Sequence, residues 1–328
     1  MDRIIPSLYI NITEKCNMKC EYCPAYGENW ESTEGLMDLE SLLSVVRIAH
    51  SRGIVSYRIS GGEPMIFPKR VFAIINTLNA LGVNDIILNT NGYNLYNYMD
   101  ELKGSKFRKI KISLDTLDRE LFEEITGTNK LDDVIRSIMA VKELNLIPLE
   151  LNMVVLKKNM DHVWSILDFC VENNISLKLL DLVKYESFTR NPTDPDKYFD
   201  RSYVDFDTFT PEFEKRFGAP ITSRLTNNRG IPMLEYKISE TATLTLKNSL
   251  YGSTFADLCK SCPIFPCQEG LFHLSLSASG NITPCRLRRD VALDLANRSA
   301  DEIANSIDET ILAYRNPFFV EHTVDFQV

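Results

Sequence analysis

The sequence lacks any long apolar run, because no stretch of it approaches the ~18 consecutive apolar residues of a membrane-spanning helix. Its first residues, Met-Asp-Arg-Ile-Ile-Pro, do not form a secretory signal peptide. Positive charge is also scarce: 36 Lys and Arg stand against 45 Asp and Glu, which gives a net charge of −9. We therefore expect a soluble cytoplasmic protein that binds no membrane and has no general nucleic-acid-binding surface.

Internal repeats, coiled-coil heptads and low-complexity segments are absent too, so the 328 residues suit one large domain or two modest ones. Cysteine, in contrast, is well represented, with eight residues. Three lie near the N-terminus and four late in the chain, while Cys170 stands alone on a helical pattern and is predicted to be a core thiol. In a chain expected inside the cell, two groups of cysteines indicate metal sites before disulfides.

The N-terminal group is Cys16, Cys20 and Cys23, spaced C-x3-C-x2-C directly after the apolar segment 8–12. Three thiols in so tight a loop make a poor disulfide set, because their number is odd and the loop is short. Soft thiolates suit iron–sulfur chemistry. Three of them can hold three irons of a four-iron cluster and leave the fourth iron open to a small chelating molecule. The alternatives are a zinc loop, which normally needs a fourth ligand, and unrelated surface thiols.

Residues 7–182 alternate strand-like and helix-like segments. The repeated β-then-α order predicts parallel strands joined by crossover helices, and six such units predict an α/β fold built on an incomplete (β/α)6 barrel. The expected strands are 8–13, 55–60, 85–90, 109–113, 149–155 and 176–181, and the expected helices are 39–52, 70–81, 119–143 with an interruption near residue 127, and 161–172.

Polar residues follow these strands, at the end where the chemistry of such sheets collects. The residues that follow or close the second to fifth strands are, in order, Gly61-Gly62-Glu63-Pro64, Asn89-Thr90-Asn91-Gly92, Ser113-Leu114-Asp115, and Lys157 with Lys158. Turn formation explains any one of these residues, but it explains all of them together poorly. Two residues without a Cβ also let the backbone approach a ligand closely.

On these motifs the chain resembles the radical S-adenosylmethionine (SAM) enzymes, whose C-x3-C-x2-C loop carries an aromatic residue, here Tyr22, before the last cysteine. The resemblance implies that SAM chelates the open iron of a [4Fe–4S] cluster. Reductive cleavage of SAM then gives a 5′-deoxyadenosyl radical, which abstracts hydrogen from a substrate C–H bond. It also implies an external electron donor of the flavodoxin or ferredoxin type. The SAM-binding residues that it implies are Tyr22, Gly61, Gly62, Glu63, Thr90, Asn91 and Ser113. Their structural alternatives are a core aromatic for Tyr22 and turn or strand-end capping roles for the others.

The barrel stretches 12–23, 58–64, 90–92, 111–115 and 151–157 are similar to the GTP cyclases of molybdopterin biosynthesis, and the likeness covers residues 7–182. By this resemblance Lys157 and Lys178 align with basic substrate-binding positions, although Lys178 replaces an arginine. Residues 183–258 are expected to be a connecting region, with a loop at 185–207, a short helix at 208–217 and one strand at 236–246.

The second cysteine group surrounds a predicted hairpin whose turn is Ser279-Gly280-Asn281. The hairpin would bring the last two cysteines of the group together. Its C-x12-G-x4-C pattern resembles the start of the twitch and SPASM auxiliary-cluster modules, which implies a second [4Fe–4S] cluster. A structural zinc site with four thiolates is the alternative. The four cysteines are Cys259, Cys262, Cys267 and Cys285.

This C-terminal part departs from the cyclases. They use three auxiliary cysteines, they place two arginines on the hairpin strand where this chain has His273 and Ser275, and they end in a double glycine. Arg286, Arg288 and Arg289 follow the last cysteine instead, where they could bind a phosphate or carboxylate or form a solvated surface run. The tentative substrate residues are Lys157, Lys178, His273, Arg286 and Arg288.

We therefore expect a radical SAM barrel over 1–182, a connecting region over 183–258 and an auxiliary-cluster module with the C-terminal segment over 259–328. The substrate is expected to be a peptide or small molecule. Because the cyclase arginines are absent, the sequence favours peptide or natural-product maturation over a nucleotide- or nucleoside-type substrate. A non-catalytic iron–sulfur or zinc scaffold is the further alternative, although it would need no SAM pocket.

Overall fold

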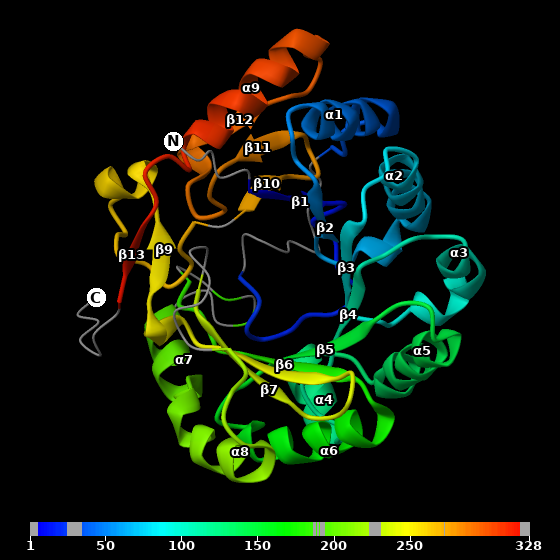
Figure 1. Cartoon of the computed structure of the whole chain (residues 1–328), viewed down its shortest axis with the longest axis vertical. Coiled ribbons are helices and arrows are strands. Elements are labelled where there is room, and N and C mark those ends of the chain that lie inside the picture. Colours follow the sequence, from blue (N-terminus) through cyan, green and yellow to red (C-terminus); the bar gives the residue numbers. More distant parts are fainter. Residues whose placement is uncertain are drawn as a thin grey trace.

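The computed structural model describes residues 6–24, 35–185, 188, 190, 194–222, 231–271 and 273–321. Among these residues, one sheet of eleven strands curls round a central space and carries helices on its outer side (Figure 1). The first six strands are neighbours in chain order and run parallel, so the predicted incomplete (β/α)6 barrel is confirmed. These strands are β1 Ser7–Asn11, β2 Ser56–Ser60, β3 Asp85–Thr90, β4 Lys109–Ser113, β5 Leu149–Val154 and β6 Ser176–Leu180.

The helices of the barrel begin and end where capping residues allow it. The Asp118 carboxylate accepts the Leu121 N–H at the start of one helix, which ends at Gly127 with φ at 71°. This glycine is the interruption that was expected near residue 127 of the helical segment 119–143, which forms two helices. No helix of the described chain is long and apolar enough to span a membrane. The barrel helices are α1 Leu39–Ser51, α2 Pro68–Ala80, α3 Met99–Lys103, α4 Arg119–Thr126, α5 Leu131–Leu144 and α6 Val163–Asn173.

The strands of the barrel alternate between apolar and polar side chains. Leu8, Ile10, Tyr57 and Ile59 are fully buried on the helix side of β1 and β2, because successive residues of a strand face opposite sides. The inward positions of a packed parallel barrel are bulky and branched, whereas here most of them are polar. The centre is accordingly a cavity of about 1680 Å³ rather than a packed core.

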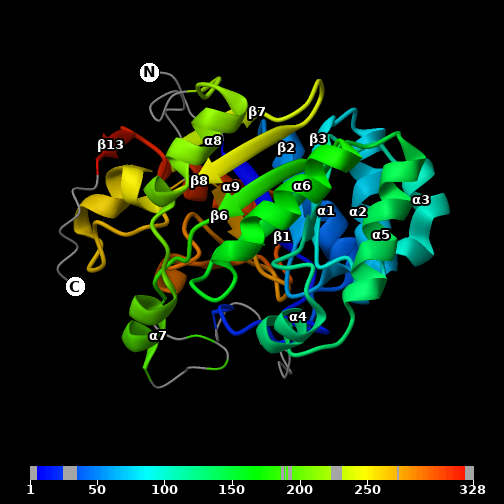
Figure 2. The ribbon, with the colours of Figure 1, turned by 90° about the horizontal axis from the view of Figure 1, so that it is seen from below.

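The connecting region contributes to the same sheet. The single strand expected over 236–246 is wrong, because the chain forms a hairpin of β7 Met233–Lys237 and β8 Thr243–Lys247, and β8 pairs parallel with β6. The expected loop over 185–207 contains a helix, α7 Pro195–Ser202, which lies at the same end of the molecule as α4 (Figure 2). The short helix expected at 208–217 is confirmed as α8 Thr210–Phe217.

The C-terminal part closes the other edge of the barrel. β10 His273–Leu276 pairs parallel with β1 and antiparallel with β11 Asn281–Thr283, which confirms the predicted hairpin. β12 Leu293–Asp294 extends this sheet. Helix α9 Ala300–Leu312, to which the sequence analysis assigned no element, packs beside α1 (Figure 1). All three predicted stretches thus supply strands to one sheet, and the boundaries at 182/183 and 258/259 stay predictions.

The remaining described elements are short. β9 Ser253–Phe255 and β13 Phe318–Val320 form a separate antiparallel pair. Residues 322–328, where the double glycine of the cyclases is missing, lie outside the described residues. The 3-10 helices are Pro64–Ile66, Leu95–Tyr98, Met160–His162, Phe206–Thr208, Ser249–Tyr251, Asp257–Ser261 and Arg289–Val291.

Candidate functional site

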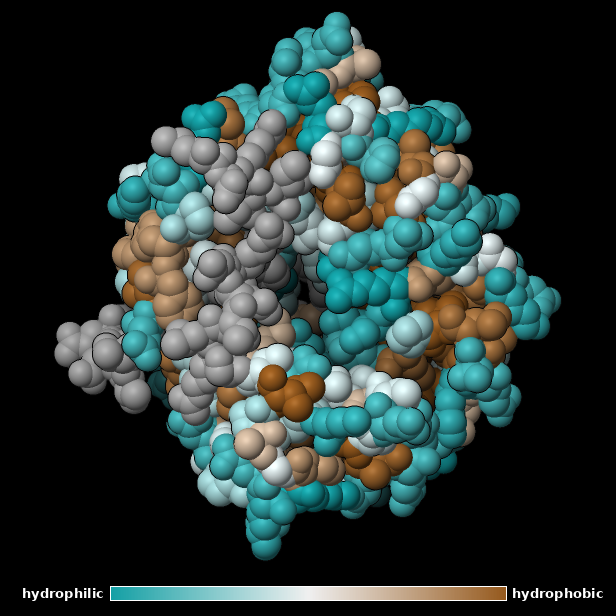
Figure 3. Space-filling model, viewed as in Figure 1, coloured by the Kyte–Doolittle hydropathy of each residue, from teal (hydrophilic) through white to brown (hydrophobic). Residues whose placement is uncertain are grey.

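The cavity runs the length of the barrel. At the carboxyl ends of the strands it is lined by the cysteine loop that follows β1, and at the amino ends by Ser56, Asp85 and Lys109, the first residues of β2, β3 and β4. Hydrophilic side chains lie beside the central hollow on the face seen in Figure 3. Cys16, Cys20 and Cys23 are not joined in disulfides, and all three line this cavity.

The cysteine loop is tied to the end of β2 through the predicted Gly-Gly motif. The Gly62 N–H donates to the Thr13 carbonyl at 2.7 Å, and the Glu63 N–H donates to the Lys15 carbonyl at 2.8 Å. A Cβ on Gly62 would lie 2.2 Å from the Lys15 oxygen, and one on Gly61, whose φ is +140°, would lie 2.5 Å from the Thr13 oxygen. The close approach that these glycines permit is therefore that of the cysteine loop itself. Their contact with SAM stays a prediction.

Glu63 joins the ends of two strands. Its buried carboxylate accepts hydrogen bonds from the Met65 N–H at 2.9 Å, the Thr90 hydroxyl at 2.7 Å and the Asn91 N–H at 2.6 Å. The Asn91 side chain donates to the Asn17 amide oxygen at 2.7 Å and lies 3.8 Å from the Cys16 sulfur. Of the predicted cofactor residues, Glu63 thus helps to hold the cysteine loop in place through its backbone N–H. Thr90, Asn91 and Ser113 line the cavity.

The sequence analysis placed Asp115 at the end of the fourth strand without assigning it a role, and the structure places it against the cysteine loop. The Tyr22 hydroxyl donates to one carboxylate oxygen at 2.6 Å, and the Val154 N–H donates to the other at 2.8 Å. Burial raises the pKa of Asp115 to about 6, although these two hydrogen bonds oppose the shift. The available signal was its place at the end of the fourth strand, but its partner Tyr22 lies 93 residues away in the chain.

The four late cysteines are not joined in disulfides, and they are close enough for the charge of one to act on another. Burial raises the pKa of Cys259, Cys267 and Cys285, to about 12 for Cys285, and in each case another cysteine of the group adds to the rise: Cys262 for Cys259, Cys259 for Cys267, and Cys267 for Cys285. Within the part of the chain that the structure describes, no three metal-binding side chains converge as closely as around a single ion. A four-iron cluster is larger than one ion, so the thiols that hold it stand further apart.

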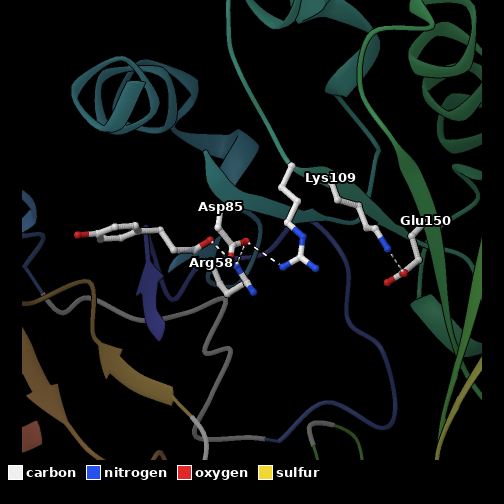
Figure 4. A network of polar contacts seen from close by, with 6 residues as sticks. Arg58, Asp85, Lys109 and Glu150 are labelled. Carbon is white, nitrogen blue, oxygen red and sulfur yellow. Dashed lines mark hydrogen bonds and ion pairs between the residues drawn. The ribbon is translucent and has the colours of Figure 1, made fainter. Parts of the chain in front are cut away.

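A network of charged side chains from four neighbouring strands, β2 to β5, lies at the amino end of the cavity (Figure 4). Arg58 pairs with Asp85 at 2.9 Å, and Lys109 pairs with Glu150 at 2.5 Å. The Lys111 ammonium group forms an ion pair with the other carboxylate oxygen of Glu150 at 2.6 Å. The signal for this network was the alternation Lys-Ile-Lys-Ile-Ser of β4, which places two lysines on the cavity side.

Three of the five tentative substrate residues line the cavity, namely Lys178, His273 and Arg286. Burial and the positive charges of Lys111 and Lys247 lower the pKa of Lys178 to about 7, against the opposing effect of Glu150. Burial and Arg286 lower the pKa of His273 to about 3, so its ring is neutral. The Arg286 guanidinium pairs with Glu269 at 2.8 Å.

The other two tentative substrate residues do not reach the cavity. Lys157 is exposed, and its ammonium group donates to the Asp200 carbonyl at 3.0 Å. The Arg288 guanidinium pairs with Asp290 at 2.7 Å. The prediction for Lys157 rested on its place after a strand and on its alignment with a basic position of the cyclases, and that for Arg288 on its place after a cysteine. Neither basis revealed the direction in which the side chains point.

Comparison with known proteins gives the family. The Radical SAM superfamily pattern matches residues 10–170. The probable GTP 3′,8-cyclase of Pyrococcus horikoshii is 31% identical over 329 residues, which cover 98% of this chain and 97% of that relative. The GTP 3′,8-cyclase of Peptoclostridium acidaminophilum is 34% identical over 191 residues, 57% of this chain and 58% of the relative.

Among solved structures, Streptococcus suis SuiB bound to S-adenosylmethionine is similar in fold, with a TM-score of 0.62 at 17% sequence identity. The likeness covers 91% of this chain and 65% of the SuiB chain. Since the family pattern spans the barrel from β1 to α6 and a cyclase matches from end to end, this chain belongs to the radical SAM superfamily and is an enzyme that uses a [4Fe–4S] cluster and SAM.

Proposed function

We propose that this radical SAM enzyme acts on a phosphorylated, nucleoside-type small molecule in a cyclase-like reaction that begins with hydrogen abstraction from a C–H bond. The observation that carries the proposal is the basic lining of the barrel cavity, where Arg58, Lys109, Lys111, Lys178 and Lys247 face the same space. Arg and Lys side chains are the usual partners of phosphate groups. The end-to-end similarity to a probable GTP 3′,8-cyclase supports the same substrate class.

The sequence alone favoured peptide or natural-product maturation, because His273 and Ser275 occupy the positions of the cyclase arginines. The cyclase relatives favour the nucleoside-type alternative instead. The cavity also contains basic residues that the sequence analysis did not single out, Lys109, Lys111 and Lys247. These lysines supply positive charge for an anionic substrate without the two arginines. Membership of an enzyme family removes the non-catalytic scaffold from consideration.

We assign Cys16, Cys20 and Cys23 as the thiolates of the SAM-binding cluster, because they lie on one loop with the C-x3-C-x2-C spacing and line the cavity. When bound, the cluster and SAM supply the one-electron cleavage that starts the reaction. The chain fixes this loop through Gly62 and Glu63. We further propose that Tyr22, Gly61, Thr90, Asn91 and Ser113 surround SAM.

We assign the four late cysteines as ligands of a second [4Fe–4S] cluster, with structural zinc as the alternative. Their mutual proximity and their soft thiolates fit either group. Four protein thiolates would leave no open iron for the substrate. The reductant required for SAM cleavage is proposed to be an external flavodoxin or ferredoxin.

The test is an anaerobic incubation of the reconstituted enzyme with SAM, dithionite and each ribonucleoside, its monophosphate and its triphosphate in turn. We expect one nucleotide to stimulate formation of 5′-deoxyadenosine and to give a rearranged product, both detected by mass spectrometry. The C20A variant should form neither. Failure of every nucleotide to stimulate SAM cleavage, while the wild-type enzyme carries its cluster, would refute the proposed substrate class.

A further inference from the structure

We propose that Asp115 is a positioning residue for the SAM-binding end of the barrel. Its carboxylate holds Tyr22, and through Tyr22 it holds the half of the cysteine loop that carries Cys20 and Cys23. The role concerns how the chain shapes the cluster site, whichever substrate the enzyme uses.

Both oxygens of the Asp115 carboxylate are engaged, and their partners come from different parts of the chain. One accepts from the Tyr22 hydroxyl at 2.6 Å, and the other accepts from the N–H of Val154, the last residue of β5, at 2.8 Å. Asp115 is only 3% exposed. The Asp115 backbone carbonyl also accepts from the Asn159 side chain at 3.0 Å. A buried residue whose carboxylate is held at both oxygens and whose backbone carbonyl is held by Asn159 gives the loop a rigid anchor on the β4–β5 side of the barrel.

The two halves of the cysteine loop have different supports. The first half, before Cys16, is fixed to β2 by the backbone bonds of Gly62 and Glu63. The second half has two backbone bonds to the end of α4, from the Lys19 N–H to the Thr126 carbonyl at 2.7 Å and from the Glu21 N–H to the Ile125 carbonyl at 3.0 Å.

Side chains complete the support of the second half. The Glu21 carboxylate pairs with Lys158 at 2.8 Å near the surface. The Tyr22 ring packs against a small buried cluster of Leu156, Leu182, Phe188 and Tyr198. Because Tyr22 stands between two cluster ligands, the hydroxyl–carboxylate bond governs where their thiols lie relative to the cavity.

Substitutions at the two ends of this bond separate positioning from folding. In Y22F the ring remains in its apolar cluster and only the hydroxyl is lost. In D115N the charge is removed and only one side-chain atom can still accept, so the charge-assisted bond that Tyr22 donates is lost when the amide oxygen accepts from Val154. D181N is the matched control: Asp181 is also a buried carboxylate just after a strand, but it accepts from the Ser249 N–H at 2.7 Å rather than from the cysteine loop.

The experiment uses the anaerobically reconstituted, full-length enzyme and measures the iron content, the dissociation constant of SAM, and the change that SAM causes in the electron paramagnetic resonance spectrum of the reduced cluster. We expect Y22F and D115N each to weaken SAM binding by roughly tenfold, the typical effect of losing a hydrogen bond to a buried charged group. Both should also alter the SAM-dependent spectrum. The double variant should be no weaker than D115N alone, because both changes break the same bond.

The expected behaviour of D181N is wild-type SAM affinity and an unchanged spectrum. Two results would overturn the proposal. One is a wild-type spectrum and SAM affinity in Y22F and D115N. The other is an equal loss in D181N, since that would identify a general effect of removing a buried carboxylate. Loss of iron from the N-terminal site alone in D115N would support the role, because it would place the cysteines under the control of Asp115.

Discussion

At the scale of single residues, the cysteine loop can take its position only because Gly61 and Gly62 have no side chain. The loop backbone occupies the space where their Cβ atoms would stand, and two backbone hydrogen bonds cross the contact. The Gly-Gly pair is therefore part of the architecture that presents the cysteines. Any contact that the pair makes with SAM comes in addition.

Gly62→Ala should consequently destabilise the protein and lower its iron content. The new Cβ would lie 2.2 Å from the Lys15 carbonyl oxygen, so the loop backbone must move. We expect a loss of about 2 kcal/mol in the free energy of unfolding, as is typical of overpacking. Urea denaturation and iron analysis of the reconstituted protein measure the two effects.

Gly104→Ala is the matched control, because its φ is −80° and the nearest atom to a new Cβ is 3.7 Å away. This variant should match wild type in iron content and lose little stability. Equal iron contents in the Gly62 and Gly104 variants would show that the loop has room for a side chain, and would contradict the argument from close approach.

At the scale of elements, Glu150 ties β5 to β4 through two lysines that line the cavity. It is cross-strand neighbour to Lys111, and its carboxylate contacts Lys111 at 2.6 Å and Lys109 at 2.5 Å. Burial alone would raise the pKa of Glu150, but the charges of Lys111, Lys109 and Lys178 outweigh it and lower the pKa to about 2. The carboxylate therefore stays ionised at every pH at which the enzyme is expected to work.

Glu150→Gln should lower stability in a pH-dependent way. A carboxyl group whose pKa is lower in the folded chain contributes stability above its unfolded pKa of about 4.3, and this contribution is lost as the pH falls through about 2. At neutral pH the variant should lose on the order of 3 kcal/mol, because two lysines then face each other without a carboxylate. The difference from wild type should shrink steadily below pH 4, as urea denaturation across that range would measure.

The E124Q variant provides the comparison, since Glu124 also pairs with a lysine, Lys158 at 2.6 Å, but is 60% exposed. This variant should lose less than about 1 kcal/mol in the free energy of unfolding at neutral pH. A pH-independent difference between E150Q and wild type would indicate a packing defect and would contradict the electrostatic account.

The elements differ in how well the sequence predicted them. The third and fourth strands were predicted to the residue, because the apolar run of the third and the alternation of the fourth are bounded by clear turn residues. The hairpin of β7 and β8 was read as one strand, because its turn, around Ser239-Glu240-Thr241, contains no glycine, asparagine or proline. Helix α9 had a readable signal that was missed, the capping box of Ser299 and Glu302.

The candidate site was also predicted only in part, because local patterns were readable and long-range pairs were not. The cysteine spacing and the polar strand ends are local patterns, and the structure places most of these residues around the cavity. The bond between Tyr22 and Asp115 and the network around Glu150 join residues that are far apart in the chain. Such pairs depend on strand register and barrel closure, which a single sequence does not supply.

At the scale of the whole molecule, the barrel sheet is extended at both ends by strands that the sequence analysis placed outside the barrel. β8 and β7 continue the sheet after β6, and β10, β11 and β12 continue it before β1. The hairpin that connects Cys267 to Cys285 is thus an integral part of the cavity wall. The two cysteine groups belong to one framework but depend on different local supports.

This arrangement predicts two iron sites that can be lost one at a time. Two four-iron clusters require about eight irons per chain in anaerobically reconstituted protein. C20A should reduce this to about four irons and abolish SAM cleavage, while C285A should remove the other four and leave the SAM-dependent spectrum of the first cluster in place.

Elemental analysis for iron and zinc decides whether the later cysteines hold a cluster or a structural zinc. About four irons with one zinc, and the zinc lost only in C285A, would assign the later group to structural zinc. Loss of all iron in either variant would contradict separate supports, because the backbone bonds of Gly62 and Glu63 do not involve the later cysteines.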